Sequence, residues 1–422
     1  MINMAMIKFN KYKVFLITLL FSYNSYNAQI STLQTLNGQT VVINPITTAV
    51  PFLLIGPDSK QGAMGDVGAA TDPDANAIHW NGSKMVFSDK KFSFGLSATP
   101  WLRTLVPDIY LYYLGGYAKV RKNTSVGGSL RYFSLGNIDL TNINGVQTGS
   151  IRPNEFALDA AISQKLSDNF SMGVAMRFIN SGISRAFTSN ANSARTAAVD
   201  ISGYYKSNEF KLSDKKAIAT AGFAFTNLGA KIKYSNDPNF IPMNMRLGGG
   251  LKTKFDDYNT FGFYLDFNKL LVPTSPIYKH KVDASGQPTN EIEIDPATGE
   301  KVILKGKNPN VPVAQGIFQS FGDAPGGAKE ELQEVNIATG VEYTYNNAFS
   351  LRAGYFYEPK TKGSRQYVSF GAGFRYNVIK IDLSYLIPTL INNPLARTLR
   401  FSLTFDFDPA KKEQTPNPAT QP

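Results

Sequence analysis

The amino-acid sequence alternates apolar and polar residues along most of its length. In one segment the apolar positions are Met172, Val174, Met176 and Phe178, and small or polar residues lie between them. Alternation with a period of two over roughly eight to ten residues predicts a strand with one apolar and one polar face. About fourteen such segments begin near residues 92, 109, 124, 155, 170, 197, 217, 244, 260, 336, 349, 367, 378 and 398.

The connections between these segments alternate in length. Those after even-numbered segments are short, as at residues 121–123 and 256–258, and only residues 207–216 are longer. Those after odd-numbered segments are mostly long, and the longest covers residues 270–335. Short turns at one end and long loops at the other are typical of bacterial outer-membrane barrels, and a soluble sandwich has no reason to sort its loops in this way. We therefore predict an all-β, 14-stranded antiparallel transmembrane outer-membrane β-barrel over residues 91–407.

Composition agrees with a membrane barrel. Charged residues are 18% of the chain and aromatic residues 12%, whereas a typical soluble domain has about 25% charged residues. After residue 21 no uninterrupted apolar run approaches the roughly 18 residues that a spanning helix needs. The net charge is +11, but the lysines are scattered without a basic stripe, so we expect no nucleic-acid partner. The absence of cysteine excludes disulfides, thiolate metal sites and a cysteine nucleophile.

The two ends of the chain carry signals of a different kind. Residues 1–28 have lysines at positions 8, 11 and 13 followed by a short apolar run at 14–21, which predicts a cleaved secretory signal peptide. The protein is therefore expected to be exported and to insert in outer-membrane lipid. Residues 408–422 are rich in Pro, Lys and Gln and predict a disordered periplasmic tail.

A stretch rich in Gly, Ala and Asp at residues 51–84 follows neither period and precedes the first strand. Its candidate roles are a phosphate loop, a metal loop or a plug inside the barrel. The Gly-Lys-Ser/Thr ending of a Walker loop is missing, and Ala77 and Ser83 replace the Gly and the acidic residue of a calcium loop. We therefore interpret residues 29–90 as an N-terminal plug and pre-barrel segment, with no cofactor, metal or catalytic role. Its candidate contact residues are Asp58, Met64, Gly65, Asp66, Asp72, Trp80 and Asn81.

The polar face of the predicted strands carries equal numbers of basic and acidic side chains. They are Arg131, Arg177, Arg246, Arg352, Arg375 and Arg400, and Asp159, Asp200, Asp266, Glu342, Asp382 and Asp406. A selective pore tends to show an excess of one sign. We interpret the balance as an ion-pair network in a filled lumen, because unpaired buried charges are costly. We also expect the plug residues Asp58, Asp66 and Asp72 to meet these arginines. A water-filled channel with scattered charges is the alternative.

The loop at residues 270–335 is the largest addition to a minimal barrel. It combines Pro, Gly and charged residues with an apolar motif that contains Ile317, Phe318 and Phe321. Long loops of this kind are usually functional or disordered, and exposed apolar side chains favour a function. We expect these three residues to contact a partner protein, with a passive lid as the alternative.

Several motifs together resemble the PorV family, outer-membrane proteins of the type IX secretion system within the FadL-like superfamily. The motifs lie at residues 55–58, 62–66, 67–70, 320–327, 352–356, 362–365 and 395–403, and they cover essentially the whole mature chain. One difference is residues 80–83, Trp-Asn-Gly-Ser, where the family usually has Asn-Pro-Ala.

The resemblance implies a fourteen-stranded barrel with an N-terminal plug and no transport substrate of its own. It implies association with a SprA-like translocon barrel, at whose lateral opening an extracellular loop would lie. The partners would also include cargo proteins with C-terminal sorting domains and the attachment or release complex that takes the cargo next. The alternative is a FadL-type transporter of hydrophobic small molecules. Such a transporter would have an apolar pocket beside its plug, whereas the polar strand face predicts a charged lumen.

Overall fold

A computed structural model describes residues 35–36, 39–40, 43–142, 144–183, 193–234, 238–284, 286, 288–390, 395–396 and 398–408. Two compact units divide the chain at residues 42 and 43. In the first unit, β1 (Thr35–Leu36) pairs antiparallel with β2 (Gln39–Thr40). The predicted signal peptide and, apart from Asp408, the predicted tail lie outside the described residues.

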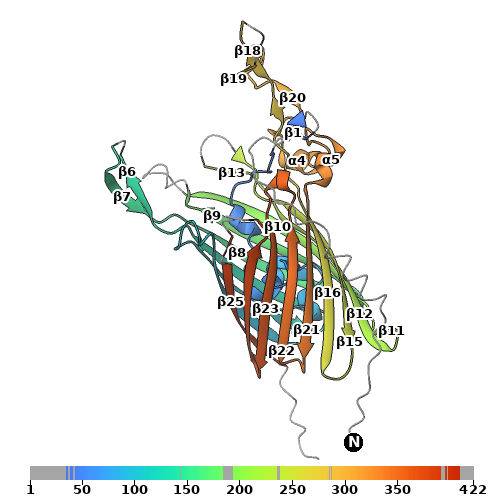
Figure 1. Cartoon of the computed structure of the whole chain (residues 1–422). Coiled ribbons are helices and arrows are strands. Elements are labelled where there is room, and N and C mark those ends of the chain that lie inside the picture. Colours follow the sequence, from blue (N-terminus) through green and yellow to red (C-terminus); the bar gives the residue numbers. More distant parts are fainter. Residues whose placement is uncertain are drawn as a thin grey trace, which may run out of the picture. The chain divides into compact units, whose positions relative to one another are not determined.

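The second unit is a closed antiparallel barrel (Figure 1). Its 14 strands are β3 (Phe92–Pro100), β4 (Tyr110–Arg121), β5 (Thr124–Ser134), β8 (Asn154–Lys165), β9 (Phe170–Ser181), β10 (Ala194–Lys206), β12 (Lys215–Gly229), β15 (Asn244–Lys254), β16 (Asn259–Leu270), β21 (Val335–Tyr345), β22 (Phe349–Tyr357), β23 (Gln366–Tyr376), β24 (Ile379–Pro388) and β25 (Thr398–Phe407). Each strand pairs with the next, and β25 pairs with β3 to close the ring. The predicted fold is confirmed.

The two ends of the barrel differ as the connection lengths predict. At one end the turns are short, and the turn after β21 places Asn346 and Asn347 at φ values of 50° and 53°. Positive φ at both central residues is the geometry of a type I′ hairpin, which Asn tolerates. Only the turn before β12 is longer, and it contains β11 (Phe210–Leu212). Short turns mark the periplasmic end of an outer-membrane barrel.

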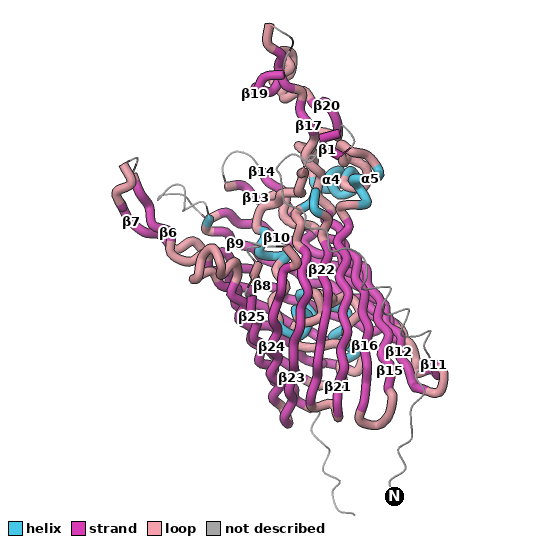
Figure 2. Tube along the Cα trace, viewed as in Figure 1, coloured by secondary structure: helices cyan, strands magenta, loops and turns pink. Residues whose placement is uncertain are grey.

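The opposite, extracellular end carries structured loops (Figure 2). The pairs β6 (Ile138–Thr141) with β7 (Gln147–Ile151) and β13 (Ile232–Lys233) with β14 (Pro238–Asn239) form two small hairpins. The longest loop contains β17 (Ile277–Tyr278), β18 (His280–Val282), β19 (Pro288–Ile292), β20 (Ile303–Lys305), α4 (Val313–Gln319) and α5 (Ala328–Leu332). A short 3-10 helix, η4 (Lys360–Lys362), lies between β22 and β23. The longest loop therefore contains both strands and helices.

Burial in the wall is inverted relative to a soluble protein. In β9 the apolar Met176 is 69% exposed, whereas Ser171 and Arg177 on the alternate positions are buried. The same pattern recurs along the other strands, so the apolar side chains form the outer surface. An outward apolar band and an inward polar face are the requirements of a barrel in lipid. No helix in the described part of the chain is long and apolar enough to cross a membrane.

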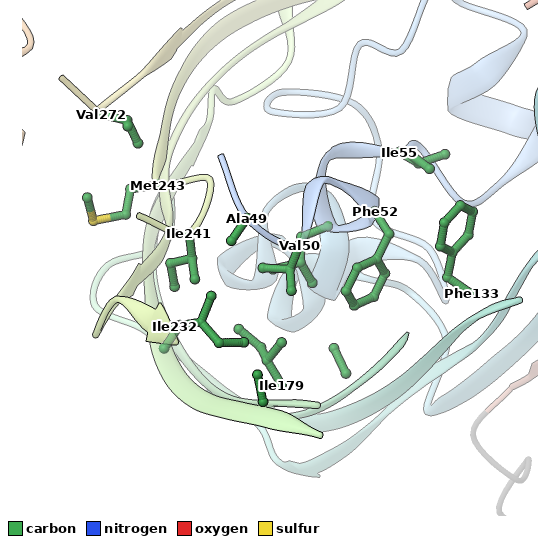
Figure 3. Packing of buried hydrophobic residues seen from close by; sticks show 14 of the residues in the cluster. Ala49, Val50, Phe52, Ile55, Phe133, Ile179, Ile232, Ile241, Met243 and Val272 are labelled. Atoms are coloured by element: carbon green, nitrogen blue, oxygen red, sulfur yellow. The ribbon is translucent and has the colours of Figure 1, made fainter. Parts of the chain in front are cut away.

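Residues 51–87 fill the inside of the barrel with four short helices (Figure 1). They are η1 (Pro51–Leu54), α2 (Ser59–Gly62), α3 (Ala77–Trp80) and η2 (Gly82–Phe87). Figure 3 shows how η1 joins an apolar cluster in which Val50 and Phe52 pack with Phe133, Ile179 and Ile241. The rings of Phe52 and Phe133 are stacked with centroids 6.0 Å apart. This segment is the plug, and it supplies the core that the barrel wall surrounds.

Glycines in the wall let the plug backbone approach closely. A Cβ atom on Gly354 or Gly340 would overlap Met64, and one on Gly222 would overlap the carbonyl of Ala69. These glycines lie on the inward face of their strands. Because no side chain separates plug from wall there, the two backbones pack directly, as glycine in a strand permits.

We predict that Gly354→Val displaces the plug. Its Cβ would overlap the backbone of Met64 and Gly65, and overpacking of this kind lowers the free energy of unfolding by about 1–3 kcal/mol or more. Urea unfolding in detergent micelles, followed by tryptophan fluorescence, measures the change. The matched control is Gly249→Val, whose Cβ would lie 3.9 Å from its nearest neighbour, the Thr220 carbonyl oxygen. Equal stability of the two variants would contradict close plug packing.

Candidate functional site

Asp66 anchors the plug to the last strand of the wall. Its carboxylate accepts hydrogen bonds from Arg400 Nη1 at 2.5 Å and from the Tyr367 hydroxyl at 2.5 Å. Asp66 has a φ of 62°, and the preceding Gly65 donates its backbone N–H to Ser369 Oγ at 2.9 Å. The tight turn thus brings a charged side chain and a backbone donor to β25 and β23, which are separated by β24.

Trp80 holds the centre of the plug together. Its indole Nε1 donates to Asp58 Oδ1 at 2.7 Å, and its ring lies over Gly68, where a Cβ atom would overlap the indole. The guanidinium of Arg246 lies 4.6 Å from the ring centroid. This cation–π contact provides favourable surroundings for a partly buried arginine whose Nε donates to Asn268.

Asp266 binds plug backbone instead of an arginine. Its Oδ2 accepts the backbone N–H groups of Gly68 at 2.7 Å and Ala69 at 2.9 Å. The amide of Asn81 donates to the carbonyls of Ala69 and Gly203. The plug is therefore bonded to the wall on two sides, through its main chain at Asp266 and through the Asn81 side chain at Gly203.

Two groups of buried charges cross the wall strands. In the first, Arg177 bonds Asp159 at 2.5 Å and Asp200 at 2.9 Å, and Arg131 contacts Asp159 at 3.3 Å. Asn227 accepts a further bond from Arg177. Buried ion pairs keep their geometry because each partner would otherwise be left as an unpaired charge.

The second group lies on β21, β22 and β24. Arg352 bonds Glu342 and Asp382, each at 2.7 Å. Nearer the periplasmic end, Arg375 pairs with Asp406 at 2.9 Å, and the Arg375 side chain is 35% exposed. The ion pairs therefore become more exposed towards the periplasm.

Most of the charged residues expected in the lumen lie close to one another, but several of them bind partners other than those expected. Among the plug carboxylates expected to meet arginines, only Asp66 does so. Asp58 accepts from Trp80 and caps α2, and Asp72 pairs with Lys252 at 2.6 Å. Arg246 is partly buried and Asp266 is buried, but both bind other groups. Sequence reasoning missed the inward lysines Lys60, Lys252 and Lys380, although Lys252 and Lys380 follow the strand period of the arginines chosen.

Two cavities lie on opposite sides of the plug. The extracellular one, of about 550 Å³, has a mainly apolar lining that includes Ile46, Phe52, Ile55, Trp101 and Phe133. The periplasmic one, of about 260 Å³, has a mainly polar and charged lining. The two cavities share no lining residue. Within the described residues, no group of three or more His, Asp or Glu side chains could hold a metal ion.

Helices α4 and α5 form a loop platform, residues 313–334, over the extracellular mouth. Its base is a buried Glu334, which bonds Lys269 at 2.6 Å, Lys362 at 2.9 Å and the Thr274 hydroxyl at 2.5 Å. These partners come from two segments of the chain, one at the end of β16 and one at η4. The network fixes the platform to the ends of β16 and to η4.

The platform presents apolar side chains on its outer side. Phe318 is 78% exposed, Phe321 51% and Leu332 77%. Ile317, expected to be exposed with the two phenylalanines, instead packs against the apolar cluster at the plug. The helical turn of α4 explains the difference, because adjacent residues point in different directions. Leu332 was missed because it lies outside the apolar motif.

Comparison with known proteins identifies a family. A model of the family described as type IX secretion system protein PorV matches residues 38–277. A comparison with curated proteins gives no match.

Similar solved structures are barrels of low sequence identity. The toluene transporter TodX of Pseudomonas putida has 13% identity and a TM-score of 0.44, covering 86% of this chain and 98% of its own. The toluene transporter TbuX of Ralstonia pickettii has 12% identity and a TM-score of 0.43, with coverages of 84% and 100%. A FadL homologue of Pseudomonas aeruginosa has 13% identity and a TM-score of 0.40, with coverages of 86% and 99%.

We predict that Arg352→Met strongly destabilises the barrel. The substitution leaves Glu342 and Asp382 without their arginine, and removing one member of a buried ion pair lowers the free energy of unfolding by about 3–5 kcal/mol. Urea unfolding in detergent measures the difference. Arg375→Met is the control, because its partly exposed pair with Asp406 contributes about 1 kcal/mol or less. Similar losses for both variants would contradict the assigned burial.

We predict that the loop platform is held more tightly at pH 5 than at pH 7.5. Burial, with the charges of Glu331 and Glu334, raises the pKa of Asp323 to about 6. The docked loop therefore binds this proton more strongly than a free loop, so docking strengthens as pH falls through about 6 and weakens as pH rises. Hydrogen exchange of the 313–334 amides, corrected for the intrinsic rate, should slow by about two- to tenfold at pH 5.

The control is Asp323→Asn, which keeps an oxygen to accept the Thr274 backbone N–H but cannot titrate in this range. Its corrected exchange should not change between the two pH values. A pH dependence that persists in this variant would assign the effect to another group.

Proposed function

The chain belongs to the PorV family of type IX secretion system proteins and forms an outer-membrane barrel, and on this premise we propose that it works by contact with other proteins. Its partners are a SprA-like translocon barrel, cargo proteins with C-terminal sorting domains and the attachment or release complex. The protein receives cargo as it leaves the translocon and passes it on at the cell surface. No catalytic step is involved.

The observation that carries this proposal is the apolar face of the loop platform. Phe318, Phe321 and Leu332 are all more than half exposed, and the platform beneath them is fixed by buried ion pairs around Glu334. Large apolar side chains exposed on one loop favour a protein interface, and aromatic side chains supply much of the binding energy at such interfaces. Because the base is rigid, little conformational entropy is lost when a partner binds.

The sealed lumen supports the same role. The extracellular and periplasmic cavities share no lining residue, and plug residues contribute to the lining of both. A polypeptide therefore has no path through this barrel. Cargo would pass through the translocon and meet this protein at its extracellular surface.

A second candidate function is the uptake of a hydrophobic small molecule. The observation that favours it is the extracellular cavity of about 550 Å³, in which Phe52, Trp101 and Phe133 contribute to an apolar lining. The charged groups that fill the lumen below it disfavour passage of such a ligand, because they would lose their partners on opening. Uptake of a hydrophobic nutrient by a deletion strain distinguishes this function from secretion.

We predict that the triple variant Phe318→Ser, Phe321→Ser, Leu332→Ser no longer binds the translocon barrel. Each serine removes an exposed apolar side chain, and although Phe321→Ser also removes the contact of that ring with Lys269 Nζ at 5.7 Å, the bonds of Glu334 remain, so the variant should fold normally. The yield of translocon barrel that copurifies with the tagged protein should fall by about tenfold or more. Proteins with C-terminal sorting domains should accumulate in the periplasm of the same strain.

The control is Val146→Ser on the β6–β7 hairpin, where Val146 is 60% exposed. It removes an apolar side chain from another extracellular loop and should leave both readouts unchanged. Normal copurification and surface display in the triple variant would reject the platform as the contact. Normal secretion together with reduced hydrophobic uptake in a deletion strain would favour the transporter.

A further inference from the structure

Three lysines line the periplasmic mouth of the barrel from the inside. Lys165 and Lys206 are the last residues of β8 and β10, and Lys119 lies two residues before the end of β4. Each continues the inward phase of its strand, after Tyr117, Ser163 and Tyr204 respectively. All three are partly buried. They therefore point into the mouth of the lumen instead of towards lipid.

The backbone of each lysine is held in place. The N–H of Lys119 bonds the Lys91 carbonyl, that of Lys165 bonds Asn123 and that of Lys206 bonds Asn169, each at 2.8 Å. Two of the side chains lie beside the segment at residues 87–91, where the plug leads into β3. Lys165 Nζ lies 4.7 Å from the Phe87 ring centroid, and Lys206 lines the periplasmic cavity together with Phe87.

These lysines form no close ion pair, although Asp89 on the segment at residues 87–91 attracts Lys119 through space. Other lysines on the same cavity are paired, Lys60 with Asp74 and Lys252 with Asp72. Among the described residues, Lys119, Lys165 and Lys206 have no carboxylate within 4.0 Å. Like charges held near one another repel, which destabilises the folded state. A role in binding accounts for this arrangement better than a role in stability.

The spacing of the lysines limits what they can bind. One strand, β5, separates β4 from β8, and one strand, β9, separates β8 from β10. Neighbouring strands lie about 4.8 Å apart, and the register displaces each lysine from the previous one by two residues along the strand, so the lysine Cα atoms follow one another at intervals of about 12 Å. An extended polypeptide rises about 3.3 Å per residue, so every third side chain repeats at about 10 Å, a difference that the flexible lysine side chains can span.

We propose that this lysine row binds an extended acidic peptide segment of a periplasmic protein. Carboxylates at every third position would each meet one lysine. A small anion such as phosphate is too short to bridge the row. Lipid headgroups lie outside the wall, whereas the lysines face inward. The inference rests on the orientation of the barrel and not on the loop platform at its other end.

The test measures binding of a labelled peptide, (Glu-Ser-Ser)₄, to the purified protein in detergent by fluorescence anisotropy. The protein should bind this peptide and not (Gln-Ser-Ser)₄, with affinity that falls as salt rises. The variant Lys119→Gln, Lys165→Gln, Lys206→Gln should bind about tenfold more weakly or worse. The matched control, Lys122→Gln, Lys211→Gln, Lys215→Gln, removes three exposed lysines from the periplasmic turns and should bind normally.

Since none of the three lysines forms an ion pair, the triple variant should retain heat-modifiable gel migration, which reports an intact barrel. If it does not, the three single variants are measured, each with an expected loss of about two- to threefold. Unchanged binding in the lysine-row variants would overturn the proposal. So would equal weakening in the turn variant, or complete displacement of the peptide by millimolar inorganic phosphate.

Discussion

The lipid-facing surface of this barrel is apolar, and so the buried charged side chains deep in the wall bind groups inside the lumen. These charged side chains are bound in two ways. Arginines bridge carboxylates on neighbouring strands, as Arg177 and Arg352 do. Where a carboxylate meets the plug, it binds backbone N–H groups, as Asp266 does. The plug is therefore a structural requirement of the wall, because it supplies the donors and acceptors that water would otherwise provide.

The same requirement explains why the barrel could be predicted from the sequence. The bilayer requires apolar side chains on one face of every strand. The two-residue period can therefore be recognised in the sequence without knowing which residues are in contact. The observed strands begin within a few residues of the predicted positions. Loop lengths were equally informative, since turns at the periplasmic end need only reverse the chain. Both signals are local in the sequence, and the fold follows from them.

Partner choice inside the lumen was less predictable. Charge balance indicated a paired network, but Arg246 and Asp266 show that opposite signs on inward positions do not define a pair. Their partners depend on where Trp80 and Gly68 lie, and the plug has no period from which to place them. The base of the loop platform was missed for a related reason. Glu334 is bonded to Lys269 and Lys362, and no spacing along the chain connects these segments.

The bond between Asp66 and Arg400 has a consequence for how the molecule is assembled. The two residues are 334 positions apart, and Ser59 bonds Ser402 across 343 positions. The plug leaves the export machinery first, yet its anchors on β25 arrive last. Contacts of such high sequence separation form late and slowly. The plug can therefore bond β25 only after the rest of the chain has been exported. Plug anchoring and the pairing of β25 with β3 both depend on the last strand.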